Sequence, residues 1–407
     1  MTSPYELNLR HLRAVAAIDA NGSLSAAADA VSLSQPALTQ GLARLEAQIG
    51  AALFERRPDG MRTTAAGAVV ALRAAEAVGQ LAQAMRTAAR AGGFAMPERL
   101  LTMAQVRAFL ALADAGSFAG AAAATGIAPP SLHRATRDVE RLAGAPLIER
   151  RGRGLALTGR GRQAARGFRL AIKAIEAGLA EVAGLSGNPA GSITIGAMPL
   201  ARARLLPDAL AALCQRHPRA HVAVVEGAHR ELVDLLRDGR IDLMVGALRE
   251  PAPGPDIVQA PLCADRLAVI ARAGHPLSGR PSIEPHRLAA FPWIIGLPGA
   301  PVRALWERMF EVEGAALPPA PIDCGSVMTI RGLLLSGDFL TLLSPDQVWV
   351  ELEAGLLEVI AGAVVPATRT IGISTRAGWR PTPEQQDLIA LLVTAGERLS
   401  QNLWQDH

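Results

Sequence analysis

The chain has 407 residues, half of them hydrophobic, which is enough for two to four domains with cores of their own. An uncharged apolar run of about 18 residues, an apolar signal core at the N-terminus and a C-x-x-C spacing are all missing, so we expect a cytoplasmic protein without a membrane span, a disulfide framework or a metal site. The net charge of +4 combines +2 over residues 1–97, +6 over 98–187 and −4 over the remainder, which suggests that only the N-terminal part meets a polyanion.

Three short helices are predicted first along the chain. Apolar residues from Leu9 to Ile18 recur at helical spacing, and Gly22 ends the run. A short alanine-rich helix is expected at 25–31, and a third helix from about Gln35 to Gln48 behind the N-cap residue Ser34. Two helices joined by a tight turn, the second with an exposed polar face, follow the helix-turn-helix plan.

A wing and a longer helix follow this helix-turn-helix. Two short segments, Leu53-Phe54 and 61–64, flank a basic tip at 56–60 and predict a hairpin-like wing. The pattern then favours a helix over roughly 65–91. The pair Gly92-Gly93, together with Pro97, marks a linker after it.

The same element then occurs a second time. Residues 102–161 (copy two) align without a gap on residues 8–67 (copy one) at a shift of 94, with 20 identities in 60 positions. Copy two is followed by a helix over roughly 160–184. Its apolar residues alternate at spacings of four and three: Phe168, Ile172, Ile175, Leu179 and Val182. Such a seam favours a dimer contact, and burial against its own domain is the alternative.

The C-terminal half alternates short strands with helices. The break at 187–191 ends the helical pattern, and helices are expected at stretches such as 205–217 and 230–237. The alternation is typical of an α/β domain with a mostly parallel sheet, and its length suggests two lobes with a ligand cleft between them. The candidate strands are 193–195, 222–225, 243–245, 267–270, 293–295, 340–343 and 371–373.

These residues resemble the LysR-type family of bacterial transcription regulators. The resemblance is carried by LRHLRAVAAIDANGSLSAAADAVSLSQPALTQGLARLEAQIGAALFERR at 9–57 and TTAAG at 63–67. Weaker echoes in the C-terminal half are GSITIG at 191–196, LPDALAALCQRHP at 206–218, LLRDGRIDLMVGAL at 235–248 and HPL at 275–277. The resemblance implies an effector domain like the type II periplasmic-binding fold. The family normally has one winged domain, so copy two is a departure.

The expected architecture is therefore multidomain, with two winged helix-turn-helix domains and one two-lobed α/β effector domain. The expected segments are a winged domain at 5–67, a linker helix and Gly/Pro linker at 68–97, a divergent winged domain at 98–161, a linker or dimerisation helix at 162–187 and the effector domain at 190–402. The resemblance further implies a homodimer or homotetramer.

Copy one has the chemistry to read a base sequence in double-stranded DNA. Gln35 can make a bidentate contact to adenine, Pro36 and Ala37 offer apolar surface to a thymine methyl, and arginines neutralise phosphates. The alternative is a solvated helix face. The candidate DNA-binding residues are Ser34, Gln35, Pro36, Ala37, Thr39, Gln40 and Arg44 on the helix, with Arg56, Arg57 and Arg62 on the wing.

Copy two keeps the apolar frame but not this reading face. Pro129 stands where copy one has Gln35, which removes the bidentate reader, and Asp138 stands where copy one has Arg44, which would repel a phosphate. The copy is nevertheless the more basic of the two. It therefore either contacts the DNA backbone, reads a different site or serves as a scaffold. Its candidate DNA-binding residues are Ser131, His133, Arg134, Arg137, Arg150, Arg151 and Arg153.

The resemblance also places an effector site between the lobes. Hydroxyls and free N–H groups at helix N-termini suit an anionic small molecule. Capping is the alternative role for the two hydroxyl residues in the set. The implied effector-binding residues are Met198, Pro199, Leu200, Ala201, Leu248, Gly296, Leu297, Gly299, Ser326 and Thr329.

The sequence thus predicts a ligand-responsive regulator of transcription. The alternative is a DNA-binding regulator or architectural protein whose C-terminal domain binds a partner and senses no ligand. An enzyme is not expected, because the chain lacks H-E-x-x-H, G-x-S-x-G and G-x-x-x-x-G-K-[ST] patterns. We expect no cofactor and no catalytic residue.

Overall fold

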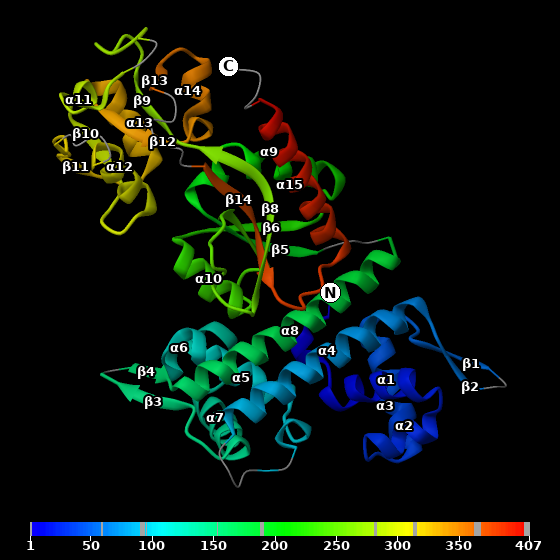
Figure 1. Ribbon diagram of the computed structural model, residues 1–407. Coiled ribbons are helices and arrows are strands. Elements are labelled where there is room, and N and C mark those ends of the chain that lie inside the picture. Colours follow the sequence, from blue (N-terminus) through cyan, green and yellow to red (C-terminus); the bar gives the residue numbers. More distant parts are fainter. Residues whose placement is uncertain are drawn as a thin grey trace. The chain divides into compact units, whose positions relative to one another are not determined.

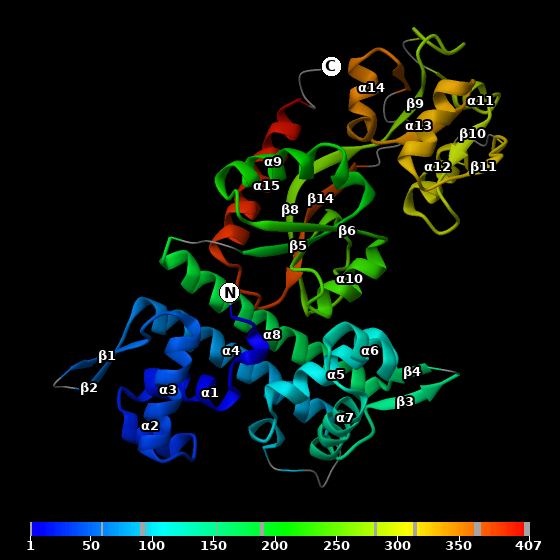
Figure 2. The ribbon, with the colours of Figure 1, turned by 180° about the vertical axis from the view of Figure 1, so that it is seen from behind.

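The computed structural model describes residues 2–57, 60–89, 94, 96–152, 154–187, 191–280, 283–311, 316–361 and 368–402. They form two compact units. The first unit contains residues up to Ile193 with two short segments, 219–221 and 237–240, and the second contains the rest of the chain. Figures 1 and 2 show the elements of each unit from opposite sides.

Copy one forms the three expected helices and the wing. Asn8, Ser23 and Ser34 are the N-caps of the three helices, and each side chain accepts a hydrogen bond from a backbone N–H of the first turn. The elements are the 3-10 helix η1 (Pro4–Glu6), α1 (Leu9–Asn21), α2 (Leu24–Ala30), α3 (Gln35–Ile49), β1 (Phe54–Arg57), β2 (Gly60–Thr63) and α4 (Ala65–Ala88).

Copy two repeats this order. Its first two helices also have side-chain N-caps, Thr102 and Ser117, whereas Ala128 precedes the third helix without a side-chain cap. The elements are the 3-10 helix η2 (Pro97–Arg99), α5 (Met103–Ala115), α6 (Phe118–Thr125), α7 (Pro129–Ala143), β3 (Ile148–Arg151), β4 (Gly154–Leu157) and α8 (Gly159–Leu185). The repeat in the sequence is therefore a repeat in the fold.

A partly buried carboxylate joins the third helix to the wing in both copies. Glu46 Oε1 accepts the backbone N–H of Leu53 at 2.7 Å, and Glu140 Oε1 accepts that of Leu147 at 2.9 Å. Each bond links the last turn of the third helix to the residue just before the first wing strand. The shared glutamate thus fixes the wing against the helix that precedes it.

A glycine in the first turn of each long helix allows the wing to return against that helix. A Cβ at Gly67 would overlap the carbonyl oxygen of Leu53, and a Cβ at Gly161 would overlap that of Leu147. At both positions the backbone before the wing lies so close to the helix that any side chain on the glycine would clash with it. The G at the end of TTAAG and of LTGRG is therefore a packing requirement.

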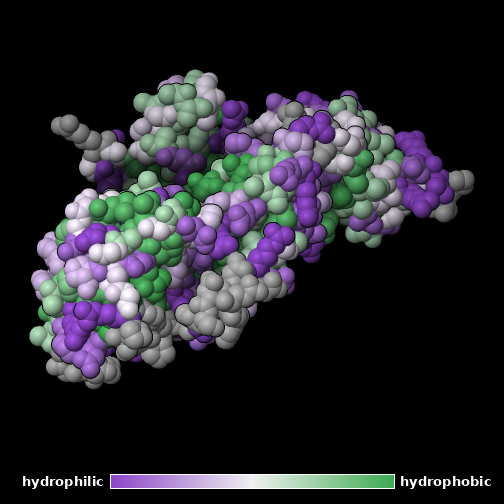
Figure 3. Space-filling view, turned by 90° about the horizontal axis from the view of Figure 1, so that it is seen from above, coloured by the Kyte–Doolittle hydropathy of each residue, from purple (hydrophilic) through white to green (hydrophobic). Residues whose placement is uncertain are grey.

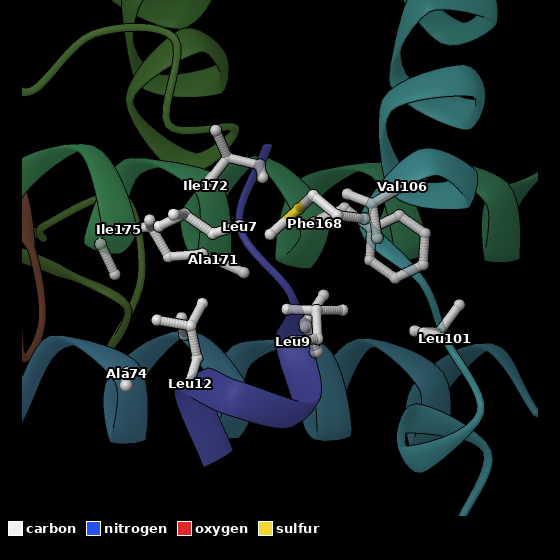
Figure 4. Packing of buried hydrophobic residues seen from close by; sticks show 14 of the residues in the cluster. Leu7, Leu9, Leu12, Ala74, Leu101, Val106, Phe168, Ala171, Ile172 and Ile175 are labelled. Atoms are coloured by element: carbon white, nitrogen blue, oxygen red, sulfur yellow. The ribbon is translucent and has the colours of Figure 1, made fainter. Parts of the chain in front are cut away.

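The two long helices α4 and α8 form the centre of the first unit. They make the most extensive contact of any pair of elements among the described residues. Leu9 and Leu12 of α1 and Leu101 and Val106 from copy two lie with them in one hydrophobic cluster (Figure 4). The apolar seam predicted on α8 lies in this cluster as well, with Phe168 fully buried. In the structure the seam is therefore buried within the chain, which was the alternative to a dimer contact.

The helix α4 has the length and apolar composition of a membrane span, and it alone does so as a single helix among the described residues. It carries Arg73 and Glu76, and it packs against α8 and α1. A core helix has the same composition. Hydrophilic and hydrophobic residues are intermingled over the face seen in Figure 3.

The second unit has two lobes, each with a five-stranded sheet. Lobe one has the strand order β6-β5-β7-β14-β8. Its elements are β5 (Ser192–Ala197), η3 (Pro199–Arg202), α9 (Leu205–Arg216), β6 (His221–Glu226), α10 (His229–Arg237), β7 (Leu243–Ala247), β8 (Ile257–Arg266), β14 (Thr368–Arg376) and α15 (Pro383–Asn402).

Lobe two has the strand order β11-β10-β12-β9-β13. The aromatic rings of Trp293, Trp306 and Phe310 pack together in its core, with centroids 5.7–6.0 Å apart. Its elements are β9 (Ala268–Arg272), α11 (Pro285–Leu288), β10 (Trp293–Ile295), α12 (Pro301–Glu311), β11 (Ile322–Asp323), α13 (Val327–Ser336), β12 (Leu340–Leu343), η4 (Pro345–Val348), α14 (Trp349–Glu353) and β13 (Leu357–Ala361).

The prediction of mostly parallel sheets is wrong. Strands β5, β7, β10, β11 and β12 belong to parallel pairs, but β14 runs antiparallel to β7 and β8, and β9 runs antiparallel to β12 and β13. The reason is that the chain passes from lobe one to lobe two and back. Strands β8 and β13, which end before each passage, keep the direction of the βα units of their lobe, whereas β9 and β14, the first strands after each passage, run against that direction.

Candidate nucleic-acid interface and effector site

The start of α3 presents the reading face that the sequence predicts. Ser34 Oγ accepts the N–H of Ala37 at 3.4 Å, and Pro36 occupies the first turn, where its missing N–H costs nothing. Leu38 is only 1% exposed, which fixes the helix against its domain. Gln35, Pro36, Ala37 and the following Gln40 are exposed.

Thr39 is half-buried, and its hydroxyl is already engaged. The Oγ1 hydroxyl donates to the backbone carbonyl of Gln35 at 3.0 Å. A hydroxyl has one hydrogen to donate and two lone pairs to accept with. Thr39 is therefore oriented as an acceptor, which suits the exocyclic amino group of adenine or cytosine.

The predicted phosphate contacts of copy one all lie on the surface. Arg44, Arg56, Arg57 and Arg62 are exposed. Arg57 lies 3.4 Å from Glu55, but both side chains are about half exposed, so the ion pair is weak. The wing and the third helix thus present cations beside the reading face.

In copy two the first turn of α7 also projects into solvent. Ser131, His133, Arg134 and Arg137 are exposed. The His133 ring stacks on Phe118, with centroids 3.5 Å apart and an angle of 23° between the planes. Sequence reasoning missed this contact, which holds the imidazole close to the start of α6. The signal was Phe118 itself, an aromatic residue where copy one has Leu24.

The acidic residue of α7 forms an ion pair with an arginine of its own helix. Asp138 Oδ1 lies 2.7 Å from Arg141, which itself is 71% exposed. The predicted repulsion of a phosphate by Asp138 is therefore weaker than the sequence suggested. Arg150 and Arg151 on the wing are exposed. Arg153 lies outside the described residues.

One titratable group lies directly beneath the reading helix of copy one. The His11 ring packs against Gly41 of α3 so closely that a Cβ there would lie 2.7 Å from the ring. Burial lowers the pKa of His11 below its usual value, and the charge of Arg44 lowers it further. Copy two has Gln105 at the equivalent position, where it completes a capping box with Thr102.

The first half of the predicted effector set assembles on lobe one. Met198 follows β5, donates its N–H to the carbonyl of Val245 at 3.0 Å and packs against Gly246. Pro199 and Ala201 lie in the 3-10 helix after it, and Leu248 follows β7 and packs against Gly372. Leu200 lies in the same 3-10 helix.

The second half assembles on lobe two. Gly296, Leu297 and Gly299 follow β10, and Leu297 is 54% exposed, with its side chain 3.8 Å from where a Cβ on Gly325 would lie. Ser326 is the N-cap of α13, and its Oγ accepts the N–H of Thr329 at 3.4 Å. The structure therefore groups the predicted effector residues in two sets, one on each lobe, and gives Ser326 a capping contact.

Arginine contacts between the lobes were missed by sequence reasoning. Arg204 of lobe one lies 3.7 Å from Asp346 of lobe two, and its guanidinium lies 5.3 Å from the centre of the Trp349 ring. Burial raises the pKa of Asp346, Arg204 opposes that shift, and the charge of Asp265 adds to it. Both partners lie more than 140 positions after Arg204 in the sequence, so no local pattern could indicate them.

Among the residues that the structure describes, no group of three or more His, Cys, Asp or Glu side chains is placed so that it could bind a metal ion. His217, which with His221 has a metal-like spacing, instead lies 2.7 Å from Asp387 of α15. The three cysteines are free thiols.

Two exposed helix-turn-helix elements with basic wings, joined to a two-lobed α/β domain, define a DNA-binding regulator with a ligand-binding fold. Comparison with known families agrees. The model described as "LysR substrate binding domain" matches residues 186–397. The model described as "Bacterial regulatory helix-turn-helix protein, lysR family" matches twice, over 9–68 and 103–162. The chain belongs to the LysR family of transcriptional regulators, and its C-terminal half is an effector-binding domain.

Curated relatives extend over different lengths of the chain. The HTH-type transcriptional regulator GalR of Pseudomonas putida is 29% identical over 385 residues, which is 95% of this chain and 96% of that protein. An alignment of that extent includes both copies. The SDS degradation transcriptional activation protein of a Pseudomonas species is 30% identical over 301 residues, 72% of this chain and 96% of the relative.

Solved structures show the same fold. Full-length OxyR from Pseudomonas aeruginosa is 23% identical, with a TM-score of 0.54, covering 73% of this chain and 95% of that one. Full-length LysG from Corynebacterium glutamicum with bound effector Arg is 20% identical, with a TM-score of 0.53, covering 72% and 97%.

Proposed function

We propose that copy one reads the base sequence of a bacterial promoter through α3 while its arginines contact the phosphate backbone. The observation that carries this proposal is the exposed first turn of α3, where Gln35 lies beside apolar Pro36 and Ala37. Gln35 suits the N6 and N7 atoms of adenine, and the two apolar residues suit a thymine methyl. Arg44 and the wing arginines add affinity that depends on salt and carries no sequence information.

The second part of the proposal concerns the effector. A small molecule, anionic by the chemistry of its surroundings, binds between Met198 to Ala201 and Leu248 on one lobe and the 296–299 and 326–329 segments on the other. The exposed Leu297 supports this, as does the N-terminus of α13, which faces the same loop through Gly325. Binding would favour one arrangement of the lobes and so change the activity of the regulator on DNA.

Two further statements belong to the proposal. The protein acts in the cytoplasm on double-stranded DNA and is not an enzyme, as its regulatory relatives suggest. It works as a homo-oligomer, with contacts outside the α8 seam, because that seam is already buried within the chain.

Selection of duplexes from a random-sequence pool tests the DNA part. The wild-type chain should enrich one sequence, and the pair Gln35→Ala and Thr39→Ala should lose it while the helical content stays unchanged. Gln83→Ala, an exposed glutamine on α4, is the matched control and should select as the wild type does. Unchanged selection by the α3 variant would refute the assignment.

A thermal-shift screen with small carboxylates and phosphorylated compounds tests the effector part. A binder stabilises the folded state in proportion to its occupancy, so a compound that raises Tm identifies a ligand class. Ser326→Ala should weaken that shift, and Ser336→Ala at the other end of α13 should not. If every compound leaves Tm unchanged, the C-terminal domain is better described as a partner-binding domain without a ligand.

A further inference from the structure

The contacts between α4 and α8 are reciprocal. Gly178 of α8 packs against Arg73 of α4, with a built Cβ 3.0 Å from the arginine Cβ, and Gly167 of α8 packs against Ala84 of α4. The shift of 94 that superposes the copies converts 73 to 167 and 84 to 178. Exchanging the copies therefore turns one contact into the other. This pattern, in which i touches j and j touches i, is the signature of a two-fold interface.

A second reciprocal contact lies at the N-terminal segments of the copies. Arg13 of α1 donates to the backbone carbonyls of Glu98 and Arg99 in η2, the latter at 3.0 Å. The equivalent residue in copy two, Arg107 of α5, lies 5.7 Å from the centre of the Tyr5 ring in η1. In each copy, the equivalent arginine of the first helix thus contacts the 3-10 helix that precedes the first helix of the other copy. The two copies are arranged as the halves of a dimer, at opposite ends of the α4–α8 pair (Figures 1 and 2).

The pairing is selective for one α4 with one α8. Arg73 forms an ion pair with Glu181 of α8, and its side chain is only 6% exposed. Position 87, which is equivalent to Glu181, holds a threonine in α4. Two copies of α4 would therefore place a threonine where Glu181 now lies, so the buried guanidinium would lose this ion pair and keep the one with Glu76 of its own helix, 3.1 Å away, which makes that pairing less favourable.

The opposite arrangement, α8 against α8, also fits poorly. It would place Gly167 against Gly178 at both crossings, where one crossing now holds the Ala84 methyl and the other holds the Arg73 stem. A gap between glycines forfeits these van der Waals contacts. The two helices are therefore complementary to each other rather than to a second copy of themselves.

We propose that one chain is by itself a complete two-headed DNA-binding unit, in which α3 and α7 engage one duplex and read two different half-sites. The inference rests on the proposed function for copy one and adds a site on copy two. A two-fold related pair of recognition helices binds half-sites one helical turn or a multiple of it apart. Because the two helices have different faces, the two halves of the site differ in sequence.

The chemistry of α7 indicates what its half-site contains. Arg134 stands where copy one has Gln40, and it is exposed beside Ser131. An arginine at a recognition helix pairs with O6 and N7 of guanine, whereas the glutamines of α3 pair with adenine. Arg137, Arg150 and Arg151 are also exposed and supply the positive charge that a DNA backbone attracts. The second half-site is therefore expected to be richer in guanine than the first.

Footprinting of the full chain on the duplex that it selects tests the inference. The wild type should protect two dissimilar half-sites. Ser131→Ala with Arg134→Ala should lose protection and base preference in one half only, and Gln35→Ala with Thr39→Ala in the other half only. Arg216→Ala, which removes an exposed arginine from α9 of the effector domain, is the matched control and should leave both halves protected.

A transfer of the reading face gives a positive result to look for. Placing the copy-one face on α7, with Pro129→Gln, Ser131→Ala, His133→Thr and Arg134→Gln, should make the chain prefer an inverted repeat of the first half-site. The preference over the wild-type site should be about tenfold or more, since one bidentate base contact discriminates by that order.

The outcomes separate the two proposals. If the α7 variant, with helical content unchanged, protects and selects the same site as the wild type, copy two is a scaffold and the inference fails while the role of α3 stands. A wild-type site made of two identical halves would also overturn the inference, since copy one from two chains would then read both. If the α3 variant keeps the whole site, the proposed function itself fails.

Discussion

Gly167 on α8 provides a direct measure of the pairing between α4 and α8. Replacing it by alanine puts a Cβ into the Ala84 methyl and within 3.0 Å of the Gln80 carbonyl oxygen. Carbon atoms in contact prefer about 3.5–4.0 Å, so the two helices must move apart. Overpacking of this kind in a well-packed interior costs about 1–3 kcal/mol.

A second glycine supplies the matched control. Gly79 lies in the middle of α4, is exposed, and a Cβ there would meet nothing within 4 Å. Alanine in place of glycine inside a helix stabilises it by roughly 0.5–1 kcal/mol, and this gain applies to both variants. The difference between Gly167→Ala and Gly79→Ala therefore isolates the overpacking, and it should be about 1–3 kcal/mol in favour of Gly79→Ala.

Hydrogen exchange on the full chain is the suitable assay. All five tryptophans lie after residue 193, so their fluorescence does not report on α4 or α8. Amide exchange gives the free energy of local opening for peptides of these helices without requiring the whole chain to unfold in one step. The amides of α8 should exchange about 5- to 150-fold faster in Gly167→Ala than in Gly79→Ala. Equal protection in the two variants would show that the helices do not meet at this crossing.

Three further outcomes are expected. Since the pKa of His11 is lowered, the unfolded chain takes up a proton more readily than the folded one, so copy one should lose stability as pH falls below about 6.5. His11→Gln, the residue of copy two, should remove this loss in amide exchange at pH 7.5 and 5.5, and an unchanged pH dependence would exclude His11 as its source. Charge reversal at Arg150 and Arg151 should lower the slope of log affinity against log salt by about two if both contact phosphates, and an unaltered slope would exclude those contacts. Burial, with Asp346 and Asp265 nearby, raises the pKa of Cys263 to about 11, so at pH 8 this partly buried thiol should react with an alkylating agent much more slowly in the folded protein than the exposed Cys214 does, and should react faster after unfolding. Labelling of folded Cys263 as fast as that of Cys214 would contradict its raised pKa.

Much of the first unit can be predicted from short stretches of the sequence. The N-cap Ser34, the Pro36 after it and the spacing of Leu38 and Leu42 place the start and the buried face of α3 without any knowledge of its neighbours. The repeat then assigns the same element to copy two. The observed helix α3 begins at the predicted residue and ends one residue beyond the predicted Gln48.

The element that packs against an apolar helix face cannot be predicted from the local sequence. Periodicity shows that Phe168, Ile172 and Ile175 of α8 must be covered, but it does not distinguish a second chain from α4 of the same chain. The distinction depends on Gly167 and Gly178, whose meaning appears only when the opposing Ala84 and Arg73 are known. A glycine inside a predicted helix is an ambiguous signal until the packing is seen.

The missed strand β8 has a similar explanation. Pro261 interrupts the β-branched pattern of 257–266, and a proline inside a run argues against a strand. In the structure Pro261 lies opposite Gly372, where the register of β8 and β14 shifts. The shift accommodates the proline, and it could not be anticipated because the two strands are more than 100 positions apart.

Duplication within one chain allows the two crossings of α4 and α8 to differ. In a symmetric dimer of two identical helices, position 73 of each helix would pack against position 84 of the other. The large Arg73 would then require a glycine at position 84 of the same sequence. Here the demand is met by Gly178 on the other copy, while Ala84 is free to face Gly167. The same freedom applies at the DNA surface. The wing-fixing Glu46 is kept as Glu140 because each copy needs it, whereas the reading faces diverge because each copy meets its own half of the site.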